Sequence, residues 1–378
     1  MNICFVSNVC YPFVTGGAEK RIYEIGTRLA DQGHDITLYA RHYWDGPTVM
    51  EFEGMTLCAV SPERELYTGD DGERSITEAL EFAKDVIQPL RNNLNEHDIV
   101  VASVFPYFPV LAAKLATLGT GTPLISTWHE VWGDYWNDYL GYLAPFGKTV
   151  ERLTARCPQY PIAVSETTGE KLTRIGPNED RIRVVPNGID YNKIRDTAPA
   201  EDGFNVLFAG RLIEDKRVDL LLEAFDRVST ENTTLVIVGD GPMSEELEAQ
   251  AAGLASSDRI TFLGFLEEYE DVLAQMRAAD IFAAPSTREG FGLTYAEAMA
   301  AGCTVIAADH PESAAAEVIN DAGFLAEPTV DGVAHMLQRA LDGERPPADP
   351  VERARVFSWD QIAGDALSAY QDAFNGSC

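Results

Sequence analysis

Features that mark metal, redox and disulfide chemistry are scarce in this sequence. It holds six cysteines in 378 residues, and no two of them have the spacing of a metal-binding or redox motif. An Asp-x-Asp motif and a cluster of histidine with cysteine are absent as well. The sequence therefore predicts free thiols in a reducing compartment, and it indicates no bound metal ion and no cofactor.

Basic residues are scarce too. Lysine and arginine number 29 against 60 aspartates and glutamates, so the formal net charge is −31. A chain this acidic repels nucleic acids and anionic bilayers over most of its surface, which argues against a nucleic-acid partner. An acidic surplus with few lysines is typical of proteins that work in concentrated salt, where screening removes the self-repulsion. We therefore expect a halophilic, archaeal protein, with an ordinary acidic cytosolic enzyme as the alternative.

The sequence has no apolar run as long as a membrane-spanning helix, and residues 1–7 lack the charged segment and cleavage site of a signal peptide. We therefore expect a cytoplasmic protein. A peripheral contact with the inner membrane face stays open, because two local sets of basic residues could dock there. Residues Lys148, Arg152 and Arg156 would form a basic stripe at i, i+4 and i+8 on a helix, although such a stripe is more often a solvated face. The sets are Lys20, Arg21 and Arg28, and Lys148, Arg152 and Arg156.

Short apolar runs alternate with helical patterns along the whole chain. This alternation is typical of βαβ units, so the sequence predicts an α/β fold with parallel sheets. A chain of this length exceeds one core, and two Rossmann-like domains follow. The first domain's expected strands cover residues 3–7, 36–40, 56–60, 99–104, 124–127, 162–164 and 183–185. The second domain's cover residues 206–209, 235–238, 260–263, 281–284, 304–307 and 323–326.

The domain boundary is expected in the polar stretch 196–202. The first domain would then span residues 1–190 and the second residues 203–345. A loose, proline-rich segment at 343–350 precedes a last helix at about 359–374.

The most informative segment is Glu289–Glu297, in which two carboxylates bracket a glycine-rich turn that opens a helix. Glycines let backbone N–H groups approach an anion, and a helix N-terminus adds partial positive charge that suits a diphosphate. Glu297 can accept hydrogen bonds from ribose hydroxyls, and Glu289 can face a sugar. An ordinary helix start with a solvated glutamate is the alternative. The turn consists of Gly290, Phe291, Gly292 and Leu293.

A second segment has the complementary charge. The strand expected at 206–209 runs into Arg211 and Lys216 and then into an amphipathic helix. The basic pair therefore lies on a loop at the carboxyl edge of a parallel sheet, where doubly wound folds bind ligands. Arg211 offers a planar fork of donors to phosphate oxygens, and Lys216 offers a compact charge. The alternative is a surface pairing of both with Glu214 and Asp215.

In the first domain, a histidine and a glycine pair are the candidates. His129 closes a strand, so we expect it to project from the carboxyl edge of the sheet; a hydrogen-bonded structural histidine is the alternative. Trp128 and Trp132 could face a sugar, although core packing is the commoner role. Gly16 and Gly17 precede a helix and can bring N–H groups to a sugar or phosphate, or serve only as a turn.

Taken together, these segments resemble the retaining, nucleotide-sugar-dependent glycosyltransferases of family 4, which have the GT-B fold. The motifs occur in the family's order and cover essentially the whole chain. Arg217 departs from the family pattern, which often has glycine there. The motifs are Gly16–Glu19, Pro186–Asp190, Gly210–Lys216, Gly239–Pro242 and the Glu-x7-Glu pair Glu289 and Glu297.

The resemblance implies two Rossmann-like domains whose parallel sheets face each other across a cleft, with the acceptor on the first domain and the donor nucleotide on the second. A C-terminal helix, at about residues 358–378, would pack back on the first domain.

The resemblance also implies roles for single residues. His129 and Glu289 would act in catalysis by holding hydroxyls of the transferred sugar. Arg211 and Lys216 would stabilise the departing diphosphate without a metal ion, and Glu297 would hold the ribose. Further donor contacts are implied for Gly16, Gly17, Leu266, Gly290, Phe291, Gly292 and Leu293.

The implied reaction moves a sugar from a nucleotide-diphosphate sugar to the hydroxyl of a glycan, a lipid carrier or a small molecule. No carboxylate is marked as a nucleophile for a double displacement. Two alternatives remain open. One is a non-hydrolysing nucleotide-sugar epimerase of the same fold, and the other is a glycosyltransferase-like subunit that binds without catalysing.

Overall fold

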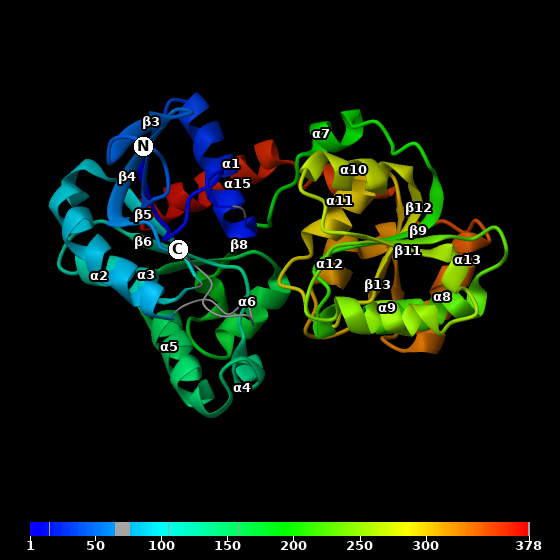
Figure 1. The fold of residues 1–378 in the computed structure, drawn as a ribbon. Coiled ribbons are helices and arrows are strands. Elements are labelled where there is room, and N and C mark those ends of the chain that lie inside the picture. The colour runs from blue at the N-terminus through cyan, green and yellow to red at the C-terminus, as the bar shows by residue number, and fades with distance from the viewer. Residues whose placement is uncertain (15, 65–75, 105, 158, 377–378) are drawn as a thin grey trace. The chain divides into compact units, whose positions relative to one another are not determined.

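The structure of the protein is a computed structural model that describes all residues except 15, 65–75, 105, 158 and 377–378. The chain divides into two compact units (Figure 1). Unit 1 comprises Met1–Pro186 and Asp360–Cys378, and unit 2 comprises Asn187–Trp359. Each unit is a largely parallel sheet with helices on both faces, so the predicted α/β fold of two Rossmann-like domains is confirmed.

Unit 1 is built on a sheet that has eight strands within the described residues, in the order β3-β4-β2-β1-β5-β6-β7-β8. Among these described strands, only β3 and β4 pair antiparallel. The central strands are continuous apolar runs buried on both faces, as is usual for parallel sheets. The strands are β1 Asn2–Val6, β2 Asp35–His42, β3 Val49–Phe52, β4 Met55–Pro62, β5 Ile99–Ser103, β6 Leu124–Trp128, β7 Tyr160–Ala163 and β8 Arg183–Val184.

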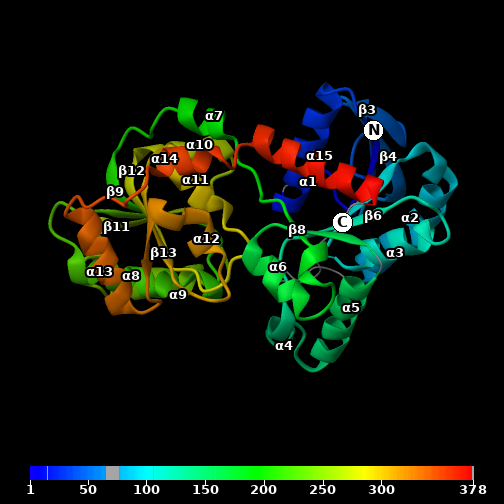
Figure 2. The same cartoon turned by 180° about the vertical axis from the view of Figure 1, so that it is seen from behind.

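The helices of unit 1 include one from the far end of the chain. Helix α15 lies beside α1 in Figures 1 and 2, where Tyr370 packs edge-on against Phe5 of the sheet and Arg28 pairs with Asp360 at 2.7 Å. The C-terminal helix thus packs on the first domain. The helices are α1 Gly17–Asp31, α2 Ile76–Asn93, α3 Phe108–Thr117, α4 Trp136–Leu140, α5 Ala144–Arg156, α6 Glu166–Thr173 and α15 Trp359–Asn375.

Unit 2 has a parallel sheet with six strands among the residues described, in the order β11-β10-β9-β12-β13-β14. This is the 3-2-1-4-5-6 order of doubly wound dinucleotide-binding folds. The strands are β9 Phe204–Ala209, β10 Leu235–Val238, β11 Ile260–Gly264, β12 Ala279–Ala284, β13 Thr304–Ala308 and β14 Gly323–Ala326. The helices are α7 Tyr191–Asp196, α8 Val218–Val228, α9 Ser244–Ala252, α10 Tyr269–Ala278, α11 Leu293–Ala301, α12 Ala315–Ile319, α13 Val330–Leu341 and α14 Pro350–Arg355.

Short 3-10 turns complete both units. They are η1 Leu94–Glu96, η2 Gly133–Tyr135, η3 Gly141–Leu143, η4 Glu179–Arg181, η5 Glu214–Lys216, η6 Ser257–Arg259 and η7 Asn320–Ala322. No helix in the described part of the chain is both long enough and apolar enough to cross a bilayer.

The division into units differs from the domain bounds expected from the sequence, 1–190 and 203–345. Unit 2 begins at Asn187 and extends to Trp359. The reason is packing at both ends of this unit. Ile189 pairs with Ser358 as a parallel bridge, and a Cβ at Gly188 would lie only 2.3 Å from the Trp359 ring. The polar stretch expected as a linker is therefore part of a folded unit.

Candidate functional site

In unit 2, the candidate residues follow the two strands at which the strand order reverses. The reversal falls between β9 and β12, which are neighbours in the sheet. The segment after β9 carries Arg211 and Lys216, and the segment after β12 carries Glu289 and the glycine-rich turn. Ligands of open α/β sheets bind outside the carboxyl ends of the strands at this point, so the topology itself marks the site.

The loop after β9 lies against the loop after β10. Gly239 has φ +131°, and a Cβ there would come within 1.9 Å of the carbonyl oxygen of Gly210, so only glycine fits. Leu212 donates its N–H to the carbonyl of Asp240 at 2.9 Å. Arg217 has φ +50°, in the left-handed region that favours glycine, which accounts physically for the glycine often found there in the family.

Lys216 and Glu289 are in direct contact. Lys216 Nζ lies 2.5 Å from Glu289 Oε1, and the side chains are only 21% and 11% exposed. Asp215 secures the contact, because its carbonyl accepts the N–H of Thr287 at 2.9 Å. The structure therefore brings the basic loop and the acidic turn together, and Lys216 does not form the surface pair with Asp215 that was the alternative.

Arg211 stands apart from this pair. Its side chain is exposed, and it has no hydrogen-bond or ion-pair partner among the residues that the structure describes. A guanidinium in that position keeps all its donors available to an anion.

The glycine-rich turn has the geometry of an anion site. Gly292 has φ +86° and caps α11, and no side chain caps this helix N-terminus. Phe291 is buried and packs edge-on against Phe357 at 5.3 Å between ring centroids. Phe291 therefore anchors the turn in the core, which leaves the turn's backbone and Leu293 as the parts that can reach a ligand.

Glu297 is inside α11 and only 8% exposed. It accepts a hydrogen bond from the hydroxyl of Tyr269 at 2.6 Å. Leu266, half-buried, follows β11 three residues before Tyr269. Tyr269 was missed by the sequence analysis, although it begins the helix that follows Leu266 at the same sheet edge.

In unit 1, His129 follows β6 and meets the end of β5. Its Nε2 lies 3.1 Å from the hydroxyl of Ser103, and both residues line a small hollow. Arg21 of α1 and Tyr370 of α15 line the same hollow. Gly16 precedes α1 with extended backbone, and a Cβ there would lie 2.2 Å from the carboxylate of Glu19, so that carboxylate would have to shift to admit a side chain at this position. Gly17 is exposed.

Three expectations in unit 1 need correction. Arg21 is buried, because it donates to the carbonyls of Val185, at 3.0 Å, and Pro186. Arg28 is tied to Glu24 and Asp360. Neither is a free cation for a membrane. Trp128 is fully buried and donates its indole N–H to Ser126, so it packs in the core and cannot face a sugar. Trp132, the other tryptophan that was expected to face a sugar, packs against Trp136 with 4.8 Å between ring centroids.

Burial, together with the positive charge of Arg21, lowers the pKa of His129 to about 3. The imidazole is therefore neutral at neutral pH. A neutral ring can donate a hydrogen bond through one nitrogen and accept one through the other, which suits a sugar hydroxyl.

This pKa predicts a pH-dependent stability. Between about pH 6.5 and pH 3 the unfolded chain binds a proton at His129 that the folded chain does not, so stability falls as pH falls through this window. The loss is at most about 1.4 kcal/mol per pH unit. We expect denaturant titrations of wild type and His129→Gln to differ by a constant free energy above about pH 7. Below about pH 6 the wild type should lose stability relative to the variant; a constant difference down to pH 5 would contradict the lowered pKa.

The described residues include no group of three histidine, cysteine, aspartate or glutamate side chains that could hold a metal ion. Two cations of the protein form ion pairs in this part of unit 2, namely Lys216 with Glu289 and Arg288 with Asp215, the latter at 3.5 Å.

Two proteins of known name are similar to this chain in sequence over most of its length. Alpha-monoglucosyldiacylglycerol synthase of Streptococcus pneumoniae is 26% identical over 82% of this chain and 72% of its own length. Glycogen synthase of Mycobacterium tuberculosis is 28% identical over 100% of this chain and 96% of its own length.

Solved structures of similar fold cover both units. Sucrose-phosphate synthase from Thermosynechococcus elongatus has a TM-score of 0.78 at 20% identity and covers 100% of both chains. Anabaena HepE in complex with UDP and glucose has a TM-score of 0.72 at 20% identity and covers 98% of this chain and 100% of its own. These likenesses confirm the GT-B fold.

Two family models match consecutive parts of the chain. The model described as Glycosyltransferase Family 4 matches residues 15–193, and the model described as Glycosyl transferases group 1 matches residues 190–357. The motifs, the fold and both matches agree, and the chain belongs to the family 4 glycosyltransferases of the GT-B fold.

Proposed function

We propose that the protein is a retaining glycosyltransferase that moves a sugar from a nucleotide-diphosphate sugar to an acceptor hydroxyl without a metal ion. The observation that carries this proposal is the contact between Lys216 and Glu289 at the point where the strand order reverses. A nucleotide sugar has a negative diphosphate joined directly to a ring of hydroxyls. A cation and a carboxylate in contact suit that junction.

The donor is assigned to unit 2. Lys216, Arg211 and the uncapped N-terminus of α11 supply positive charge for the diphosphate, and such preorganised charge stabilises a leaving group as it departs. Glu297 is assigned to the ribose, and the backbone at Leu266 to the base. HepE, of the same fold, was solved with UDP and glucose, which favours a nucleotide-sugar donor here.

The acceptor is assigned to unit 1, near His129. The hollow beside His129 is lined by Ser103, Thr127 and Arg21, and no carboxylate of the described chain lines it. A covalent glycosyl-enzyme intermediate would need such a carboxylate as nucleophile. We therefore favour attack by the acceptor on the face that the diphosphate leaves, with neutral His129 holding a sugar hydroxyl.

Peripheral binding at a membrane face is part of this proposal. The named relatives include one that by its name makes a glycosylated diacylglycerol and one that makes glycogen, so lipid and glycan acceptors both occur among similar proteins. Of the basic stripe on α5, Arg152 and Arg156 are exposed, whereas Lys148 pairs with Asp134 at 2.7 Å.

The test is a panel of nucleotide sugars incubated with glycan, lipid and small-molecule acceptors, in the presence of a chelator. We expect nucleoside diphosphate to be released and the product to keep the anomeric configuration of the donor, as followed by NMR. An inverted anomer would overturn retention, and loss of turnover with chelator would overturn metal independence. Epimerised donor would favour the epimerase alternative, and binding without turnover the non-catalytic subunit.

Replacing Glu289 and replacing Glu297 should change different kinetic constants. Glu297→Ala is expected to raise the donor KM by about tenfold with little change in kcat, because a ribose contact is equal in ground and transition states. Glu289→Ala is expected to lower kcat by about a hundredfold if it holds the reacting sugar. The exposed Glu248 of α9 gives the matched control, Glu248→Ala. The reverse pattern in steady-state kinetics would exchange the two roles.

A further inference from the structure

Unit 1 contains a second, larger hollow that the proposed chemistry does not use. It lies among α2, α3, α4 and α5. Apart from Glu78, its lining side chains are aliphatic or aromatic, and they include Ile76, Phe108, Trp136, Tyr139, Leu140 and Phe146.

The walls of this hollow are fixed before any ligand arrives. Trp136 packs against Trp132 and Tyr107, with 4.8 Å and 5.8 Å between ring centroids. Gly147 of α5 leaves room for Trp136, since a Cβ there would lie 2.3 Å from its ring. Buried Glu151 accepts the hydroxyl of Tyr107 at 2.8 Å and the N–H of Trp132 at 2.8 Å. A preformed apolar space avoids much of the ordering cost of binding.

The hollow lies at the same edge of the sheet as His129. Phe108 begins α3 directly after the segment that follows β5, and Ser103, the last residue of β5, contacts His129 at 3.1 Å. A ligand with an apolar part in the hollow can therefore have a polar part at the carboxyl edge, where the acceptor hydroxyl is assigned. Trp136, which lines the hollow, also has a buried indole N–H with no acceptor among the described residues.

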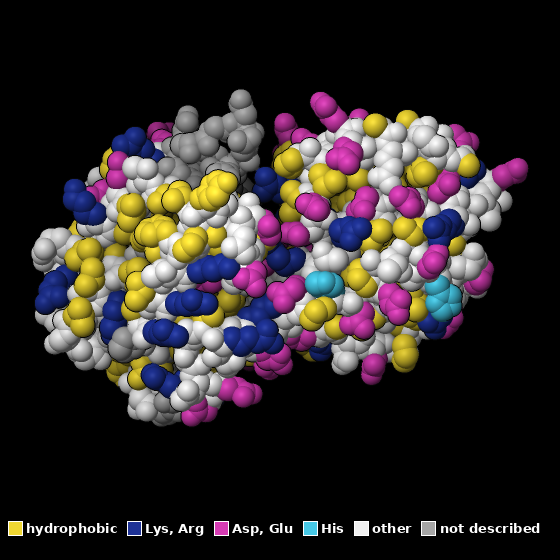
Figure 3. All heavy atoms as spheres, turned by 90° about the horizontal axis from the view of Figure 1, so that it is seen from below, with side chains coloured by type: hydrophobic (Ala, Val, Ile, Leu, Met, Phe, Trp, Pro, Cys, Tyr) yellow, Lys and Arg dark blue, Asp and Glu magenta, His cyan; other side chains and the backbone are white. Residues whose placement is uncertain are grey.

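The surface around the hollow differs from the rest of this acidic protein. Residues 76–157, which hold α2 to α5, have six basic and nine acidic residues, against 29 and 60 in the whole chain. Figure 3 looks at this side and shows lysine and arginine side chains in rows beside hydrophobic ones on the left-hand part. Exposed apolar side chains of α2 to α5 are Ile76, Leu80, Leu115, Leu118, Tyr142, Leu143, Phe146 and Leu153. Cations beside exposed apolar groups match an anionic lipid surface in charge and polarity.

We propose that the hollow binds the hydrocarbon chain of a lipid acceptor, and that the surrounding face of α2 to α5 rests on the lipid surface that carries it. This inference rests on the proposed glycosyl transfer and names the class of its acceptor. The chain would lie between α4 and α5 while the head group reaches the carboxyl edge of the sheet. Phe146 would contact the chain directly, because it lines the hollow and is also half exposed at the surface.

The first test measures chain binding without any catalysis. Alkyl glucosides from butyl to decyl, each below its micelle concentration, are titrated into the full-length protein, and binding is followed by calorimetry and by tryptophan fluorescence. We expect the affinity to rise about fourfold with each added methylene until the hollow is full. An affinity that does not depend on chain length would overturn the proposal.

A matched pair of variants on one helix sharpens the test. Phe146 and Leu153 of α5 are 51% and 56% exposed, but only Phe146 lines the hollow. We expect Phe146→Glu to weaken decyl glucoside binding by at least about tenfold and Leu153→Glu by less than about twofold. Equal losses would overturn the assignment. A solution dimer that Phe146→Glu dissociates would assign the face to a second copy of the chain and would also overturn it.

A vesicle assay tests the face, and donor turnover separates the two proposals. The wild type is expected to co-sediment with phosphatidylglycerol vesicles more than with phosphatidylcholine vesicles, and Arg152→Glu with Arg156→Glu should reduce this difference. Equal binding to both vesicles would overturn the docking face.

Sugar transfer to soluble acceptors without alkyl binding would refute the lipid acceptor alone. Alkyl binding without turnover of any donor would refute the proposed transfer, while the hydrocarbon site would stand.

Discussion

The variant Lys216→Ala is expected to turn over at least about a hundredfold more slowly than the wild type with a competent donor, because one preorganised charge at a leaving group is worth about 10² to 10³ in rate. Lys216 contacts Glu289 in a mostly buried position, where electrostatic interactions are stronger than in water. Arg211→Ala is expected to lose a similar factor through its contact with the diphosphate. Rapid-quench measurement of a single turnover reports the chemical step directly.

Two controls separate leaving-group stabilisation from damage to the protein. Arg227→Ala removes a cation from an exposed pair with Asp331 in the same unit, and it should keep the wild-type rate. The melting temperature of Lys216→Ala gives the second control, because damage to the protein would lower it along with the rate. Wild-type rates in both Lys216→Ala and Arg211→Ala would show that the donor site is assigned wrongly.

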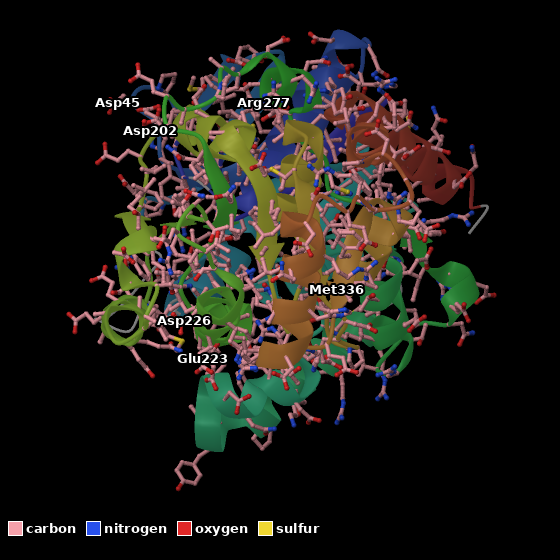
Figure 4. The ribbon with its side chains drawn as sticks, turned by 90° about the vertical axis from the view of Figure 1, so that its right-hand side faces the viewer. Asp45, Asp202, Glu223, Asp226, Arg277 and Met336 are labelled. Carbon is pink, nitrogen blue, oxygen red and sulfur yellow. The ribbon has the colours of Figure 1, made fainter. Side chains whose placement is uncertain are left out.

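Lowering the salt concentration from molar to about 0.1 M is expected to destabilise the protein strongly, because the screening length then grows from about 3 Å to about 10 Å. The effect should be largest in unit 2, which has 32 acidic residues against 13 basic, a net charge of −19. Figure 4 views this unit and labels Asp202 and Glu223, both of which are exposed. Repulsion among such carboxylates opposes the compact state unless salt screens it.

A titration of Tm against potassium chloride measures this dependence. The matched variant replaces three exposed carboxylates of α9, as Glu245→Gln, Glu246→Gln and Glu248→Gln, and it should have a higher Tm at low salt and a flatter curve. A wild-type curve that is flat, or that falls with added salt, would remove the halophile hypothesis. The assignment to the glycosyltransferase family would be unaffected.

The fold could be predicted because its strands are buried on both faces. Runs such as residues 99–102 and Leu235–Val238 are apolar without interruption, which identifies strands of a parallel sheet. Strand β3 was missed, because its residues Val49–Phe52 alternate between exposed and half-buried and pair only with β4. Whether residues 187–202 form a linker could not be predicted, since their burial depends on Trp359, far along the chain.

The site could be predicted as a set of segments but not as a set of contacts. Position after a strand placed Arg211, Lys216 and Glu289 at one sheet edge, and the order of strands brought them together. The pairing of Lys216 with Glu289, and not with its neighbour Asp215, depends on loop geometry that periodicity does not encode. Similarly, nothing in the sequence distinguishes buried Arg21 from a surface arginine until β8 and α15 enclose it.

The return of α15 to unit 1 sets an order for folding during synthesis. Unit 2 is continuous in the chain, so it can fold as soon as the ribosome has released it. The first 186 residues of unit 1 are made much earlier, yet Phe5 and Arg21 lack the packing of Tyr370 until residues 360–378 have been made. Part of the core of unit 1 therefore stays uncovered while unit 2 is made. A chain that ended before residue 360 would contain all of unit 2 but would lack the helix that completes the packing of unit 1.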